Sequence, residues 1–177
     1  MMCIVGIAHG DKVLIGADSA GSNGYSIANR KDVNVFKNDG FVIGCRTSFR
    51  MIQVLQYKFS PPKRHPETDV MKYMVSEFAE AVRSCFKEGG FAPTNNNVDT
   101  GGTFLVGYQG RLFRMDSDYQ VGESADGFDA CGCGEAYALG VMQSNTHLDP
   151  KARVLKSLET AAYFSCGVRG PFVFEEI

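Results

Sequence analysis

The sequence predicts one domain of the α+β class, spanning residues 1–177. Short apolar runs are joined in pairs by turn residues, and helical patterns fall into two blocks instead of following every strand. This order indicates antiparallel sheets covered by separate helices, because a parallel sheet needs a long crossover after each strand. The 177 residues are 44% hydrophobic, enough for one core, and no repeat or linker marks a second domain.

Two hairpins are predicted in the first quarter of the chain. Apolar, β-branched runs flank the turn residues 9–11, and a second pair flanks Asp39-Gly40, a dipeptide that strongly favours a hairpin turn. A polar, glycine-bearing stretch, residues 19–29, separates the two. The expected pairings are residues 3–8 with 12–17 and residues 33–36 with 41–45.

Helical spacing of apolar residues predicts a short helix that ends before Pro61-Pro62 and a longer one that ends before Gly89. A polar loop, a third hairpin, two more helices and a closing strand follow. Asp149-Pro150 supplies a cap and a first-turn proline for the last helix. The expected bounds are 49–57 and 69–88 for the first two helices, 91–99 for the loop, 103–108 with 112–115 for the hairpin, 135–144 and 150–164 for the later helices, and 172–174 for the strand.

Composition excludes several classes of function. The formal net charge of −2 provides no attraction for nucleic acid or an anionic membrane. No apolar run is long enough to span a bilayer, and the first residues lack a signal-peptide pattern, so we expect a cytoplasmic protein.

The six cysteines lie mostly within apolar stretches, and we interpret them as buried thiols. Cys131-Gly132-Cys133 has no CxxC partner and no nearby histidine, so we expect neither a metal nor another cofactor.

Four segments in order carry a resemblance to a known family. They are the opening Ile4-Val5-Gly6 with Gly16-Ala17-Asp18-Ser19, residues 35–39 with Ile43-Gly44, the stretch Gly132-Cys133-Gly134-Glu135-Ala136-Tyr137-Ala138-Leu139-Gly140, and residues 158–162 with 167–171. Together they resemble the proteasome β-subunits and HslV-type peptidases, which are N-terminal-nucleophile hydrolases. The resemblance covers nearly the whole chain and implies a four-layer αββα sandwich. It also implies a homo-oligomer, since family members form rings of six or seven subunits. The resemblance does not tell whether an ATPase is a partner of this chain.

In this family an N-terminal threonine hydroxyl attacks a peptide carbonyl, and a nearby lysine stabilises the reaction electrostatically. The register of the opening segment places Met2 at the nucleophile, and a thioether has no proton to give. The other positions matched in this register are Asp18 on the family's first-hairpin aspartate, Asn34 at its lysine, Cys133 at its serine and Ser165 at its later aspartate. The sequence therefore predicts a pseudoenzyme, of a divergent bacterial or phage kind, without peptidase activity.

Two alternatives remain open. Some amidotransferases with this mechanism begin with cysteine, so Cys3 could be the nucleophile, with Asp18 beside it, if Met1 and Met2 were removed. Against this, Cys3 lies one residue out of register, on the opposite face of a strand, and can equally be a small core residue. The third possibility is a purely structural assembly subunit.

A ligand pocket is the function that we expect from the remaining polar residues. Arg46 follows the strand that lines the family's substrate pocket, and an arginine there favours an anionic group. Asn34, Arg46, Ser48 and Cys133 are predicted to hold an anionic small molecule or an acidic peptide. Alternatively, Arg46 pairs with Asp18 or with a neighbouring chain. Arg30, Lys31 and Lys37 are candidates to replace the missing lysine.

Overall fold

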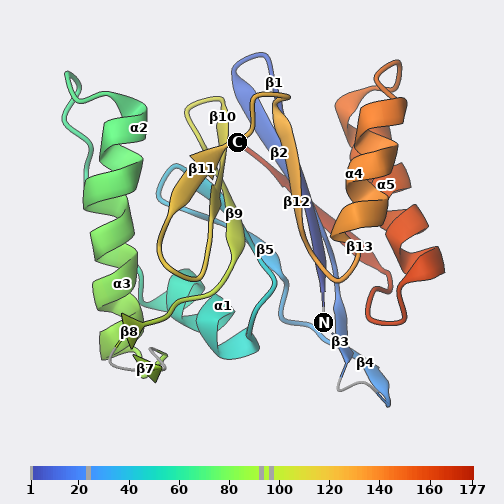
Figure 1. Cartoon of the computed structure of the whole chain (residues 1–177), viewed down its shortest axis with the longest axis horizontal. Helices are drawn as coiled ribbons and strands as arrows, with labels where there is room; N and C mark the ends of the chain where they lie inside the picture. The colour runs from blue at the N-terminus through green and yellow to red at the C-terminus, as the bar shows by residue number, and fades with distance from the viewer. Residues whose placement is uncertain (1, 23–24, 92–93, 96–97) are drawn as a thin grey trace.

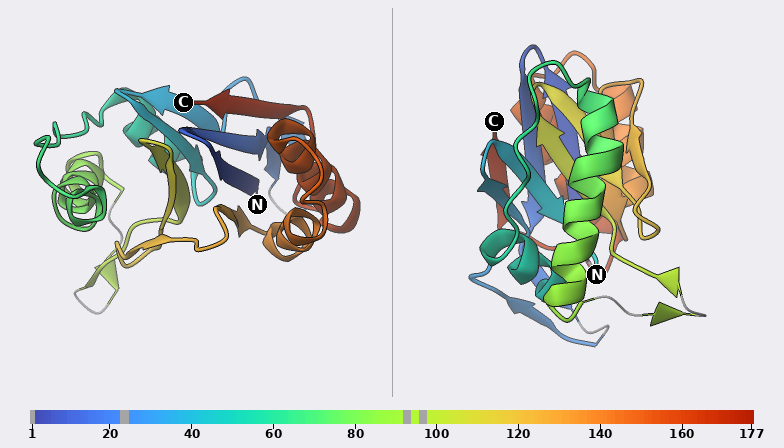
Figure 2. Two further views of the ribbon diagram at one scale, coloured as in Figure 1. Left: turned by 90° about the horizontal axis from the view of Figure 1, so that it is seen from above. Right: turned by 90° about the vertical axis from the view of Figure 1, so that its left-hand side faces the viewer.

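The computed structural model describes residues 2–22, 25–91, 94–95 and 98–177. Two sheets lie face to face, with one pair of helical segments outside each, so the order of layers is helices, sheet, sheet, helices (Figures 1 and 2). The predicted α+β class and four-layer sandwich are therefore confirmed.

Within each of the two large sheets, all neighbouring strands pair antiparallel. The first sheet has the order β12 (Phe128–Gly132), β1 (Cys3–His9), β2 (Lys12–Asp18), β13 (Phe172–Glu176). The second has the order β11 (Val121–Glu123), β10 (Arg111–Met115), β9 (Phe104–Tyr108), β6 (Phe41–Cys45), β5 (Val35–Asn38). The three predicted hairpins are confirmed. Asp39 and Gly40 both have positive φ, +45° and +84°, as their tight turn requires.

The predicted helices also form. They are α1 (Phe49–Tyr57), then α2 (Val70–Tyr73) and α3 (Ala79–Glu88) joined by a π-helical turn (Met74–Phe78), and later α4 (Glu135–Ser144) and α5 (Pro150–Phe164). Ser48, Asp69 and Asp149 cap the N-termini of α1, α2 and α5 by accepting hydrogen bonds from backbone N–H groups two or three residues on.

Alternation along β1 assigns its side chains to two different cores. Ile4 packs between the two sheets, whereas Cys3, Val5 and Ile7 pack beneath α4 and α5. Gly44 allows the sheets to approach closely, since a Cβ atom there would lie 2.5 Å from the Cγ2 atom of Ile4. A third cluster fills the space between the second sheet and helices α1 to α3.

Two short strand pairs and two further strands were not predicted from the sequence. The polar stretch after β2 contains the hairpin β3 (Ala20–Ser22) and β4 (Ile27–Asn29), and the expected loop 91–99 contains β7 (Thr94–Asn95) and β8 (Val98–Asp99). The expected loop also includes residues outside the described part of the chain. Strands β11 and β12 are short and carry charged residues, so their hydrophobic pattern is weak.

Candidate functional site

The candidate site surrounds the start of β1. Met2 is 3% exposed, and its side chain belongs to the same buried cluster as Phe36, Cys45 and Met51. The position that the sequence assigns to the nucleophile is thus occupied by a thioether packed into the core.

The last residue of β12, Gly132, and the next residue, Cys133, contact the backbone of Met2. The Met2 carbonyl accepts a hydrogen bond of 3.0 Å from the backbone N–H of Cys133, and the Cys133 thiol lies 3.5 Å from the same oxygen. Gly132 has a φ of +117°, and a Cβ atom there would lie 2.0 Å from the Met2 oxygen. Only glycine fits this contact without a shift of the backbone.

Asp18, at the end of β2, is fully buried beside this segment. Its Oδ1 atom accepts a hydrogen bond of 2.8 Å from the Cys3 N–H, and Oδ2 accepts a longer one of 3.4 Å from the Arg169 N–H. Burial raises the pKa of the Asp18 carboxyl from 3.8 to about 6, and these backbone donors oppose the rise. The carboxyl therefore holds the first strand by its backbone.

Asn34 is the residue that the sequence matched to the family's lysine. Its side-chain amide donates a hydrogen bond of 2.7 Å to the backbone carbonyl of Asp18. The backbone carbonyl of Asn34 accepts a hydrogen bond of 2.8 Å from the Cys45 N–H. Its side-chain oxygen is buried and has no hydrogen-bond partner among the described residues. The residue thus links β2 to β6 without supplying a charge.

The Cys3 thiol points away from these groups. It is buried beneath α4 and α5, close to Gly134, where a Cβ atom would lie 2.9 Å from the sulfur. Burial, followed by the neighbouring Asp18 carboxylate, raises the pKa of the thiol far above its ordinary value. Its chemistry is that of a neutral core group.

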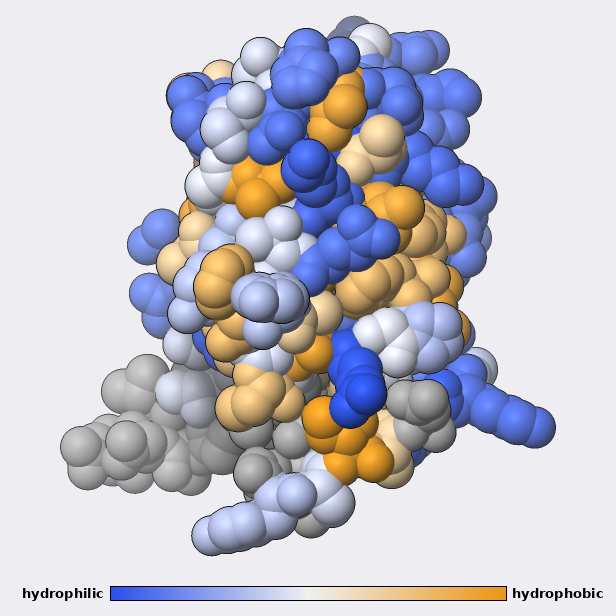
Figure 3. Space-filling view, turned by 90° about the vertical axis from the view of Figure 1, so that its right-hand side faces the viewer, coloured by the Kyte–Doolittle hydropathy of each residue, from blue (hydrophilic) through white to orange (hydrophobic). Residues whose placement is uncertain are grey.

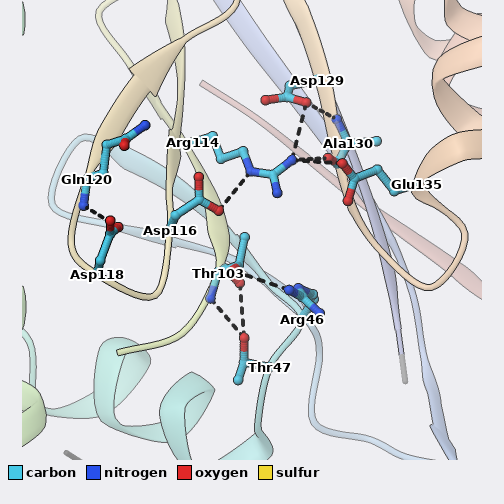
Figure 4. A network of polar contacts seen from close by, with 10 residues as sticks. All are labelled: Arg46, Thr47, Thr103, Arg114, Asp116, Asp118, Gln120, Asp129, Ala130 and Glu135. Atoms are coloured by element: carbon cyan, nitrogen blue, oxygen red, sulfur yellow. Dashed lines mark hydrogen bonds and ion pairs between the residues drawn. The ribbon is translucent and has the colours of Figure 1, made fainter. Parts of the chain in front are cut away.

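Arg46 does not pair with Asp18 in the described structure. Its guanidinium donates a hydrogen bond of 3.3 Å to the Thr103 hydroxyl, while the Thr103 N–H donates one of 2.8 Å to Thr47 (Figure 4). The Arg46 Nε atom is buried without a partner among the described residues. Ser48 serves as the cap of α1. Of the predicted pocket residues, Asn34 thus bonds to Asp18 and Cys133 bonds to Met2, whereas Arg46 and Ser48 have other contacts.

Arg114 lies at the centre of a charged network that was not predicted from the sequence. It contacts Asp116 at 3.1 Å, Glu135 at 2.9 Å and Asp129 at 3.9 Å, and donates to the Ala130 carbonyl (Figure 4). The network joins β10, β12 and the first turn of α4, so it positions the segment that contacts Met2. Only pairing across strands brings these residues together, and no local motif marks them.

The other cations proposed to replace the lysine are engaged elsewhere or exposed. Arg30 pairs with Asp32 and lies over the Phe49 ring, and Lys37 lies 3.7 Å from Glu175. Lys31 is exposed. None has a hydrogen bond or ion pair with Asp18 or Asn34 among the described contacts.

The interpretation of all six cysteines as buried thiols is wrong for two of them. Cys3, Cys45 and Cys131 are buried and Cys85 is half-buried, whereas Cys133 and Cys166 are exposed. Cys133 lies between two glycines before α4, and Cys166 lies in the turn after α5.

Neither a cluster of metal ligands nor a membrane-spanning helix is present among the described residues. No group of three or more His, Cys, Asp or Glu side chains is placed to hold a metal ion. None of the described helices is both long and apolar enough to cross a membrane.

No family model matches the sequence, and no curated protein matches it either. Solved structures do match. BPH from Thiobacillus denitrificans is 17% identical, with a TM-score of 0.80 over 99% of this chain and 97% of that chain, and it has also been solved in complex with epoxomicin. HslV from Trypanosoma brucei is 17% identical, with a TM-score of 0.69 over 98% of each chain. An Anbu Gly-1 mutant from Hyphomicrobium sp. strain MC1 is 18% identical, with a TM-score of 0.69 over 98% of this chain and 80% of that chain. At these identities the comparison establishes a shared fold.

Proposed function

We propose that this chain, which has the fold of the proteasome-like N-terminal-nucleophile hydrolases, lacks peptidase activity and acts as a self-assembling binding protein. The observation that carries the proposal is the buried side chain of Met2 at the nucleophile position. A thioether has no proton to transfer and forms no acyl intermediate.

The neighbours of Met2 support the same conclusion. Asn34 offers an amide in place of the cation that would stabilise the developing charge. The Asp18 carboxyl is fully buried and accepts hydrogen bonds from the backbone of Cys3 and Arg169. These groups stabilise the start of the fold, and none of them supplies an attacking atom.

One contact favours the alternative enzyme. If the chain began at Cys3, its α-amino nitrogen would stand 2.8 Å from Asp18 Oδ1, which would stabilise an ammonium group. The thiol of the same residue nevertheless faces α4 and α5, and it is fully buried. A substrate would reach it only after these helices moved, so we place this function second.

Self-assembly is supported by the outer face of α4 and α5. Tyr137, Tyr163 and Phe164 are 43%, 83% and 60% exposed, and the Phe164 ring stacks on Tyr137 at 5.2 Å. Only one of the ten residues of α4, Glu135, is charged, whereas a helix that faces water normally has a polar outer side. Figure 3 shows hydrophobic residues spread over this helical face. We propose that a second copy of the chain covers it.

Arg46 is the residue that we propose for ligand recognition. Its Nε donor lacks a partner and no carboxylate pairs with it among the described residues, so a carboxylate or phosphate would satisfy it. Thermal-shift measurements with acetate, phosphate and an acidic peptide should show stabilisation that Arg46→Ala removes. Arg50→Ala is the matched control, because Arg50 extends to the Gly89 carbonyl at 2.7 Å instead. Absence of any shift would leave the purely structural subunit as the better description.

Peptidase activity is tested by intact mass, epoxomicin and peptide turnover together. We expect no covalent epoxomicin adduct and no hydrolysis of fluorogenic peptide amides. Hydrolysis that Cys3→Ala abolishes, by a chain whose mass starts at Cys3, would establish the alternative enzyme. Cys166→Ala, at an exposed thiol after α5, controls for unspecific thiol chemistry.

A further inference from the structure

A cavity of about 330 Å³ lies between the first sheet and the start of α5. Leu14, Phe174 and Pro150 form its apolar surfaces, and the polar residues around it are His9, Asp149, Lys151 and Glu176. It lies at the far end of β1 from Met2, about 20 Å away for a strand of this length. In Figure 1 the chain ends marked N and C lie at these two ends of the sheets.

The cavity follows from the pleat of the sheet and the length of the helix. His9 and Leu14 point to the helical side of the sheet, and β13 places Glu176 opposite Leu14 and Phe174 opposite Gly16. Helix α5 begins at Pro150 and covers the sheet only from there onward. The last residues of β1 and β13 therefore form a hollow that the helix does not fill.

Most polar groups around the cavity already have partners. Both oxygens of Glu176 are engaged, one by His9 Nε2 at 3.0 Å and the other by the Lys12 ammonium at 3.0 Å. Asp149 Oδ1 caps α5 by accepting from the Ala152 N–H at 3.0 Å. Both oxygens of Glu176 and one oxygen of Asp149 are thus engaged within the protein.

Lys151, by contrast, has no ion-pair partner among the described residues. Its ammonium lies 5.8 Å from the centre of the Phe174 ring, and no carboxylate of the described residues is within ion-pair distance of it. An exposed lysine usually needs no partner, but this one lines a cavity that also exposes the apolar side chains of Leu14, Pro150 and Phe174. The combination offers one uncommitted positive charge beside apolar surface.

We propose that this cavity binds a small monocarboxylate with an apolar body. The carboxylate pairs with the Lys151 ammonium, and the apolar body lies against Leu14, Pro150 and the ring of Phe174. The volume is at the lower end of the range of about 300 to 1,000 Å³ that is typical of small-molecule sites, which favours a free small molecule over a peptide. This site goes beyond the proposed function, and it does not depend on the chemistry at Met2.

Isothermal titration with phenylacetate and with its neutral analogue phenylacetamide tests the proposal. Phenylacetate should bind saturably, and phenylacetamide should bind at least about tenfold more weakly because it lacks the charge. Lys151→Met keeps the alkyl chain and should weaken phenylacetate binding by about tenfold or more. Lys156→Met, at an exposed position on the same helix, should leave binding within about twofold.

Three results would overturn the assignment. They are no saturable binding of phenylacetate by the wild-type protein, equal binding of the acid and the amide, and binding that Lys151→Met leaves unchanged. Tighter binding of a short peptide ending in phenylalanine would contradict the choice of a free small molecule. Each of these results leaves the peptidase test at Met2 unaffected, so failure of this proposal is distinguishable from failure of the proposed function.

Discussion

The buried carboxyl of Asp18 accepts a hydrogen bond of 2.8 Å from the backbone N–H of Cys3. The bond joins the end of β2 to the start of β1, one residue after Met2, which the sequence matched to the family's nucleophile. Removing the acceptor by Asp18→Ala leaves this N–H buried without a partner, which should lower the free energy of unfolding by about 1 to 3 kcal/mol. Urea denaturation at pH 5 measures the loss. Asp126→Ala, at an exposed residue, should change stability by less than about 0.5 kcal/mol, and an equal effect of both variants would contradict the role of Asp18.

Stability should depend on pH through the same carboxyl. Its pKa is raised from 3.8 to about 6 in the folded state, chiefly by burial, so the folded protein holds this proton more tightly than the unfolded chain does. The stabilisation from Asp18 is therefore complete below about pH 4 and is lost as the pH rises through 6, by about 2 to 3 kcal/mol. The measurement compares wild type with Asp18→Asn, which does not titrate. A constant difference between the two from pH 4 to pH 7 would show that Asp18 has an ordinary pKa.

Gly132→Ala should be strongly destabilising. A methyl group there would meet the Met2 carbonyl oxygen at 2.0 Å, and the backbone φ of +117° is one that residues with a side chain rarely adopt. We expect a loss of at least about 2 kcal/mol in the free energy of unfolding. Gly122→Ala is the control, since its added methyl group would meet no atom within 4 Å. Equal stability of the two variants would mean that Gly132 does not hold the Met2 segment closely.

Arg114 should control the titration of Asp129. Burial raises the pKa of Asp129, and the Arg114 guanidinium opposes this rise. Arg114→Met removes the positive charge, so the Asp129 pKa should rise further, as followed by NMR of the side-chain carboxyl carbon. Arg111→Met provides a matched control, because Arg111 pairs with Glu123 at the other side of β10. An unchanged Asp129 titration in Arg114→Met would disprove the coupling.

Phe164→Glu should weaken self-association. The substitution places a charge in the exposed aromatic cluster on α4 and α5, which we propose is covered by a second copy of the chain. Light scattering after size-exclusion chromatography should show a lower mass for Phe164→Glu at the same protein concentration. Tyr57→Glu, at the 75% exposed end of α1, should keep the wild-type mass. A monomeric wild type, or an oligomer that Phe164→Glu does not affect, would refute this interface.

Local patterns in the sequence were sufficient to predict most secondary structure. The turn at Asp39-Gly40, the cap at Asp149 and the spacing of apolar residues each depend on neighbours a few positions away. The same local logic assigned Cys3 to the opposite face from Met2, because side chains alternate along any strand, and the two side chains belong to different buried clusters. Where the pattern was weak, as in β11 and β12, the strands were missed.

Contacts between distant segments were decided by tertiary structure alone. The sequence placed Met2, Asp18 and Asn34 in one region only through a family resemblance, and it expected Arg46 and Ser48 in a shared pocket. Packing gave Arg46 a partner at Thr103, made Ser48 a helix cap and brought Gly132 onto Met2, and none of these contacts was predicted. The physical reason is that hydrogen bonding and close packing depend on which surfaces meet after folding, whereas helix and hairpin formation depend mainly on adjacent residues.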